Sequence, residues 1–178
     1  MSRTVSPRWL IAWLALIVSQ ASFAAEIVHQ SPPDFLDEHL PGCQSKALWL
    51  KAPAKAEIES LLDRPYSGAR VRYCLAEGKT AWILDEIGKT EPITTGIVVD
   101  HGRVARVSVL VFRESRGGEV HREAFVRQYE QAGPGSNSGL DRHIDGITGA
   151  TMSVSAVNRQ VSLALLLDRL VRDKRRDS

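Results

Sequence analysis

The sequence predicts an α+β fold: a twisted, mainly antiparallel sheet packed with helices, forming a single domain after an N-terminal signal peptide. Short segments rich in β-branched residues follow one another across tight turns between residues 70 and 112, which is typical of antiparallel pairing. From residue 154 the apolar positions recur at helical spacing, with no Gly or Pro before residue 173. The sequence shows no internal repeat and no second domain.

Residues 1–24 are typical of a secretory signal peptide. Arg3 and Arg8 form a positive n-region, an apolar run covers residues 9–18, and small residues end the segment at Ala24. This run of ten residues is short for a membrane span, which needs about 20 residues. We therefore expect cleavage after Ala24 and a periplasmic protein. The alternative is an uncleaved anchor that holds the protein on the outer side of the inner membrane.

The charge balance argues against nucleic acid as a partner. Cleavage would remove two arginines and lower the formal net charge from +2 to 0. The remaining basic character lies at the C-terminus and in the tail, residues 174–178, where acidic residues such as Asp168 and Asp173 interrupt it. Such a segment is usually a solvated helix end, where cations also suit the helix dipole.

Residues 25–88 are predicted to form an extension of short helices and a hairpin. A helix at 34–40, between Pro-rich turns, would pack through Phe35, Leu36 and Leu40. The remaining expected elements are a strand at 47–50, a helix at 55–62, and strands at 70–75 and 80–84 that pair as a hairpin.

The chain contains two cysteines, Cys43 and Cys74. In an exported protein the oxidising compartment favours a disulfide between them. Two buried, unpaired thiols are the alternative, because the spacing does not show whether the two Cα atoms approach each other. No Cys/His spacing typical of a metal centre is present, so we expect no metal site.

Residues 89–173 form the second predicted unit. Strands at 93–99 and 104–112, rich in Val, are separated by a His-Gly turn and should pair antiparallel. An amphipathic helix is expected over 119–131, followed by a Gly- and Ser-rich loop at 133–139. No Ser-His-Asp or Cys-His arrangement can be assembled, so no catalytic residue is predicted.

Ahead of the last helix, residues 145–151 read Asp-Gly-Ile-Thr-Gly-Ala-Thr. The small residues allow a sharp turn and a close approach to a bound group, and Thr148, Thr151 or Ser153 would cap the helix. A turn that opens a helix suits a phosphate, because unpaired N–H groups and the positive dipole end point at the anion. The alternative is a helix cap that binds nothing.

This motif closely resembles the attachment motif of the FMN-binding domain family, which includes the FMN-carrying subunits of the sodium-pumping NADH:quinone oxidoreductase and of the Rnf complex. The resemblance covers about residues 90–170. It implies that FMN is bound covalently through a phosphoester bond to Thr151. It also implies that a magnesium-dependent flavin transferase installs the FMN from FAD.

The resemblance also implies roles for the neighbouring residues. Asp145 would belong to the recognition motif, and Thr148, Gly149, Ala150 and Met152 would border the phosphate or the ring. Glu114 matches a family loop beside the flavin, although Ser-Arg follows it here where relatives carry Thr-Pro. Arg116 in that loop would either neutralise the phosphate or face solvent.

The resemblance implies an exported electron-transfer flavoprotein or a component of a redox complex, and not a stand-alone enzyme. Its partners would be the flavin transferase and an unidentified membrane or periplasmic redox protein. The competing hypothesis is a non-redox periplasmic accessory module, in which the same turn binds a phosphate-bearing ligand reversibly.

Overall fold

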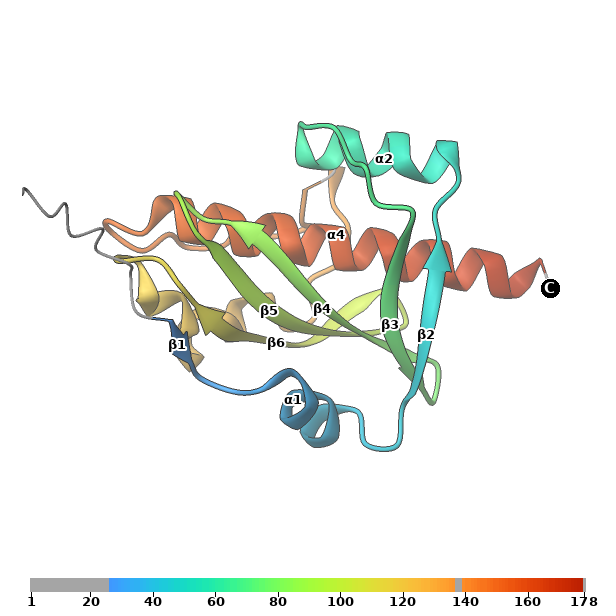
Figure 1. The fold of residues 1–178 in the computed structure, drawn as a ribbon, viewed down its shortest axis with the longest axis horizontal. Coiled ribbons are helices and arrows are strands. Elements are labelled where there is room, and N and C mark those ends of the chain that lie inside the picture. Colours follow the sequence, from blue (N-terminus) through green and yellow to red (C-terminus); the bar gives the residue numbers. More distant parts are fainter. Residues whose placement is uncertain (1–25, 137–138, 178) are drawn as a thin grey trace, which may run out of the picture.

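The computed structural model describes residues 26–136 and 139–177, so the predicted signal peptide lies outside the described residues. Within them, six strands form one antiparallel sheet in the order β1-β6-β5-β4-β3-β2 (Figure 1). The strands are β1 (Ile27–Val28), β2 (Gln44–Trp49), β3 (Arg70–Ala76), β4 (Lys79–Ile87), β5 (Pro92–Asp100) and β6 (Arg103–Phe112). The predicted α+β class and both predicted hairpins are confirmed.

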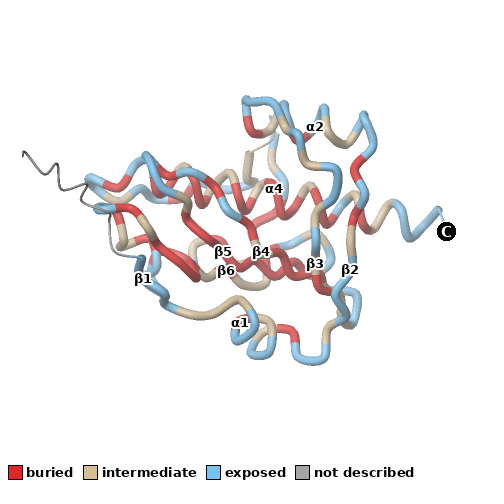
Figure 2. The backbone as a smooth tube through the Cα atoms, viewed as in Figure 1, coloured by how far each residue is buried: buried red, intermediate tan, exposed pale blue. Residues whose placement is uncertain are grey.

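Helices cover both faces of the sheet. The described helices are α1 (Pro32–His39), α2 (Ala52–Leu62), η1 (Gly118–His121), α3 (Glu123–Val126), η2 (Arg127–Tyr129) and α4 (Thr151–Arg176). The long helix α4 crosses one face and carries α2 beside it, while α1 lies on the other face (Figure 1). Buried backbone is concentrated in the central strands and along α4, and the outer sides of α1 and α2 are exposed (Figure 2).

The apolar core consists of two clusters, one on each face of the sheet, because successive side chains of a strand point to opposite faces. Ile97 and Val99 of β5 belong to the large cluster beneath α4, whereas Val98 between them belongs to the smaller cluster around Phe35 of α1. A Cβ added at Gly96 would lie 2.7 Å from the Phe35 ring, so this glycine allows α1 to approach the sheet closely. The predicted packing role of Phe35 and Leu40 is confirmed.

The predicted single helix over 119–131 is wrong. The chain instead forms η1, followed by α3 and η2, which continue directly from one to the other. Arg122 adopts an extended conformation with ψ of 139° and separates η1 from α3. The break lets Val120, Phe125 and Tyr129 all reach the core beneath α4. No continuous helix would bury these positions together with the neighbouring Val126 and Ala132 on a single narrow face.

The last helix begins at Thr151, directly at the end of the motif, and it continues through Arg176 into the predicted basic tail. One residue near its C-terminal end differs from the expectation. Asp168, which we expected on a solvated helix end, is completely buried. Its carboxylate accepts hydrogen bonds from Thr80 Oγ1 at 2.8 Å and from Arg172 Nε at 2.7 Å. A buried carboxylate is tolerated here because both oxygens have donors.

The two cysteines form a disulfide between the segment after α1 and strand β3. Cys43 and Cys74 lie 5.5 Å apart at their Cα atoms and are separated by 31 residues in the sequence. The predicted bond is thus confirmed, and it anchors the α1 segment to the sheet. In residues 26–136 and 139–177, no helix has the length and apolarity needed to cross a membrane.

Candidate functional site

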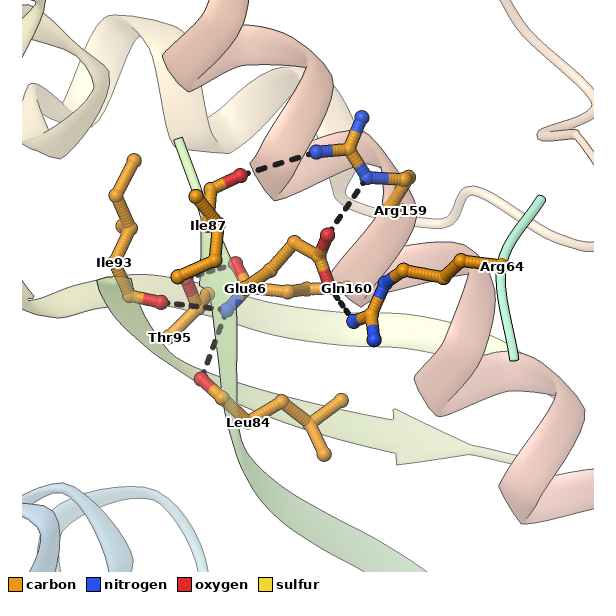
Figure 3. Close-up of polar contacts among 8 residues, drawn as sticks. All are labelled: Arg64, Leu84, Glu86, Ile87, Ile93, Thr95, Arg159 and Gln160. Carbon is orange, nitrogen blue, oxygen red and sulfur yellow. Dashed lines mark hydrogen bonds and ion pairs between the residues drawn. The ribbon is translucent and has the colours of Figure 1, made fainter. Parts of the chain in front are cut away.

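A buried amide fixes α4 to the middle of the sheet. Gln160 Nε2 donates to the carbonyl oxygens of Leu84 at 2.8 Å and Ile93 at 2.7 Å, and its Oε1 accepts from Thr95 Oγ1 at 2.6 Å (Figure 3). All the polar atoms of this side chain are satisfied although only 1% of Gln160 is exposed. These bonds fix the position of α4 along its axis relative to β4 and β5. They therefore also fix the position of Thr151, which begins the same helix nine residues before Gln160.

A second polar contact ties α4 to the end of β4. The buried carboxylate of Glu86 accepts from Arg159 Nε at 3.0 Å and from Arg64 Nη2 at 2.8 Å, as Figure 3 shows. Arg159 Nη2 also donates to the carbonyl oxygen of Ile87 at 3.1 Å. Because Ile87 is the last residue of β4, the arginine holds the start of the β4–β5 turn, residues 88–91, against α4.

We expect Gln160→Met to lower the free energy of unfolding by about 2 kcal/mol, because Met keeps the chain length but leaves buried polar groups without a partner. Urea denaturation followed by tryptophan fluorescence measures this change. Thr95→Val, which removes one of the three bonds, should cost less. The double variant should lose less than the sum of the two, since the two residues share a hydrogen bond. A loss below about 0.5 kcal/mol for Gln160→Met would contradict this role.

A cleft of about 600 Å³ lies at the N-terminal end of α4, in the size range of cofactor sites. Residues from three separate segments line it: the β4–β5 turn, the loop after β6, and the first turn of α4 with the residues before it. The lining residues are Lys89, Glu114, Ser115, Arg116, Gly149, Ala150, Thr151, Met152 and Ser153.

The turn before α4 leaves the helix start open. Gly149 adopts a φ of +81°, a conformation that favours glycine, and a Cβ added there would meet nothing within 4 Å. Ala150 is the N-cap residue, and no side chain caps the helix, so capping by Thr148, Thr151 or Ser153 is wrong. The first helical bond runs from the Val154 N–H to the Ala150 carbonyl oxygen at 3.0 Å. The three preceding amides are therefore outside the helical hydrogen-bond pattern, and the Thr151 side chain is exposed.

The loop after β6 packs directly against this helix start. Gly117 has a φ of +86°, and a Cβ added there would lie 2.5 Å from Ser153 Oγ and 3.2 Å from Ala150 Cβ. A side chain at residue 117 would force the two walls of the cleft apart. The glycine therefore sets the close contact between the Glu114–Gly117 loop and the first turn of α4.

Glu114 holds the third segment of the cleft. Its Oε1 accepts the backbone N–H groups of Lys89, Thr90 (2.6 Å) and Glu91 (2.9 Å), and its Oε2 accepts Thr90 Oγ1 at 3.2 Å. Burial alone would raise the pKa of Glu114, but these hydrogen bonds outweigh it and hold the pKa below its usual range. The carboxylate is consequently charged at neutral pH and acts on the β4–β5 turn. Its role as a direct cofactor contact stays a prediction.

The structure brings together five of the seven predicted site residues. Glu114, Gly149, Ala150, Thr151 and Met152 all line the cleft. Thr148 lines an adjoining cavity of about 540 Å³ that shares Ser115, Arg116 and Gly149 with the first.

Asp145 lines neither cavity and is exposed. Its carboxylate lies 3.7 Å from His143 Nε2, and its N–H donates to Gln128 Oε1 at 2.7 Å. An exposed position suits recognition by another protein better than contact with a group in the cleft.

Sequence reasoning missed Lys89. It lies 62 residues before Thr151, in a turn without any motif, and contacts with distant residues such as Glu114 bring it to the cleft. Arg116, for which the sequence left two alternatives, is exposed and lines both cavities.

A further cavity, of about 470 Å³, lies between α2 and α4, but it contains fewer polar groups available to a ligand. Its lining is largely apolar, and its two arginines are already engaged. Arg169 pairs with Glu57, and Arg172 pairs with the buried Asp168. The cleft at the start of α4 is the better candidate, because it combines hydroxyl, amide and cationic groups.

The segments that line the cleft also match a known protein family. Residues 88–166 match the family model described as the FMN-binding domain. The match begins in the β4–β5 turn and ends within α4, so it contains every residue that lines the cleft. No curated protein and no solved structure matches the chain.

Proposed function

Because residues 88–166 form an FMN-binding domain, which makes this protein an FMN-binding flavoprotein, we propose that FMN is held covalently by a phosphoester bond to Thr151. The loaded protein would take part in electron transfer outside the cytoplasm. The isoalloxazine ring supplies the chemistry, since it accepts and releases one or two electrons. The residues of this chain bind and orient it.

The exposed hydroxyl of Thr151 at an uncapped helix start carries the proposal. A phosphate on Thr151 Oγ would lie beside the amides of Thr151, Met152 and Ser153, which have no acceptor within the helix. The positive end of the α4 dipole favours the same negative charge. Gly149 adds no side chain to obstruct the group, and the volume of the cleft is adequate for a nucleotide.

The bond would be formed by a separate flavin transferase. The Thr151 hydroxyl would give its proton to a base of the transferase and attack the FMN phosphorus of FAD, the pyrophosphate bond would break, and AMP would leave with the electron pair. Magnesium would neutralise the pyrophosphate during this transfer. Thr151 is the acceptor substrate in this step, so this chain requires no catalytic base of its own. The exposed Asp145 would be available to the transferase.

We further propose that the protein works in the periplasm after export, with a membrane or periplasmic redox protein as its electron-transfer partner. If the N-terminal segment is instead retained as an anchor on the outer side of the inner membrane, the cleft would bind FMN in the same way. The exposed apolar side chain of Met152 supports access for a partner, because it lies next to Thr151 and is 49% exposed.

The mass of the intact protein, produced with and without the transferase, tests the proposal. We expect the mass of residues 25–178 alone without the enzyme, and that mass increased by one FMN moiety with it. The flavin should remain on the protein after denaturing electrophoresis, where it is detected by fluorescence. Flavin that binds but is lost on denaturation would instead favour the reversible phosphate-binding module. A retained N-terminal segment would favour the anchored form.

A further inference from the structure

Lys89 is a cation at the cleft for which the described residues provide no counter-ion. Its side chain is exposed and lines the same cavity as Thr151. Within the described part of the chain, its ammonium group makes no ion pair. By contrast, the α4 arginines Arg159 and Arg172 each form an ion pair with a buried carboxylate, Glu86 and Asp168 respectively. An unpaired cation at a cleft is available to an anion that enters it.

The backbone around Lys89 is held from two sides. The Glu114 carboxylate accepts the N–H groups of Lys89 and the next two residues, and Arg159 binds the carbonyl oxygen of Ile87 immediately before the turn. Gly88 permits this packing, since a Cβ there would lie 2.8 Å from Glu114 Oε1. The turn is closed by a bond from the Gly88 N–H to the Glu91 carbonyl oxygen at 3.0 Å. The Glu114 carboxylate therefore accepts four hydrogen bonds, three from backbone N–H groups and one from Thr90 Oγ1. These bonds fix the backbone of the turn that carries Lys89.

We propose that the Lys89 ammonium is the electrostatic partner of the anionic flavin nucleotide in this cleft, and that Glu114 is the positioning residue that places it. This inference rests on the proposed function. The nucleotide carries negative charge on its phosphate, and its ring gains negative charge when it accepts electrons. A cation held on the cleft wall attracts both negative charges.

The test compares Lys89→Gln, Lys89→Arg and a matched control, Lys46→Gln, in the exposed edge strand β2. We expect Lys89→Gln to acquire covalent flavin about fivefold more slowly at limiting transferase, as expected for the loss of one steering charge. Its loaded form should show a lower midpoint potential in a spectroscopic redox titration. Lys89→Arg should behave as the wild type in both measurements, and so should Lys46→Gln. Slower flavin loading in Lys89→Gln would show that the Lys89 ammonium acts on the phosphate. A lower midpoint potential would show that it acts on the ring.

Glu114→Gln tests the positioning role. It should shift the same measured quantity as Lys89→Gln, and it should add little when combined with Lys89→Gln, because both act through one ammonium group. Full additivity in the double variant would overturn that role.

If Lys89→Gln equals the wild type in both rate and potential while the wild type loads normally, the Lys89 proposal is wrong and the proposed function stands. If the wild type never acquires covalent flavin, both proposals fail.

Discussion

Replacing Thr151 with alanine is expected to abolish covalent flavin completely and to leave the fold intact. Thr151→Ala removes the hydroxyl that we propose accepts the phosphoryl group, but it keeps a good helix former at the first residue of α4. Because the Thr151 side chain is exposed and caps nothing, the free energy of unfolding should change by less than about 0.5 kcal/mol. Intact mass after production with the transferase measures the loss, and Thr151→Ser should retain the added FMN mass.

Two nearby hydroxyls provide internal controls for that experiment. Ser153→Ala should leave covalent flavin in place, since Ser153 is buried against Gly117 although it lies in the same turn of α4. Thr148→Ala should have a milder effect, because Thr148 lines only the adjoining cavity. An FMN mass gained by the Thr151→Ala protein would refute the assigned attachment residue and most of the proposed function.

Removing the disulfide is expected to cause the largest loss of stability. The bond closes a loop whose ends are 31 residues apart, and the chain-entropy relation assigns such a loop about 3–4 kcal/mol at 25 °C. The double variant Cys43→Ala, Cys74→Ala should lose this amount in urea denaturation. Alanine is the suitable replacement because Cys74 is buried in the small apolar cluster beside α1.

A reducing agent gives an independent check of the same bond. Wild-type protein in excess dithiothreitol should unfold at nearly the urea concentration of the double variant, and the variant itself should be unaffected by the reagent. Two alkylatable thiols in native protein purified without reductant would contradict the disulfide. The cleft at the start of α4 should survive in the folded variant, since neither cysteine lines it.

Local patterns predicted most of the elements. The Val-rich alternation of β5 and β6 and the tight turn between them define an antiparallel pair within about twenty residues, so no distant contact was needed to recognise it. The predicted helix over 119–131 failed for the opposite reason. Its apolar residues face a core built by α4, and that distant contact favours three short turns over one helix.

The sequence by itself determined which chemical groups lie at the start of α4. The motif that ends at Thr151 lies in one uninterrupted stretch, so its small residues, its hydroxyls and the helix that follows could all be read locally. Only the tertiary structure decided which residues complete the cleft and which polar groups are buried. Glu114 meets the turn of Lys89 across about 25 residues, and Gln160 meets the β4 and β5 backbone across more than 60. Such contacts depend on how the sheet and α4 pack, and no local residue pattern encodes that packing.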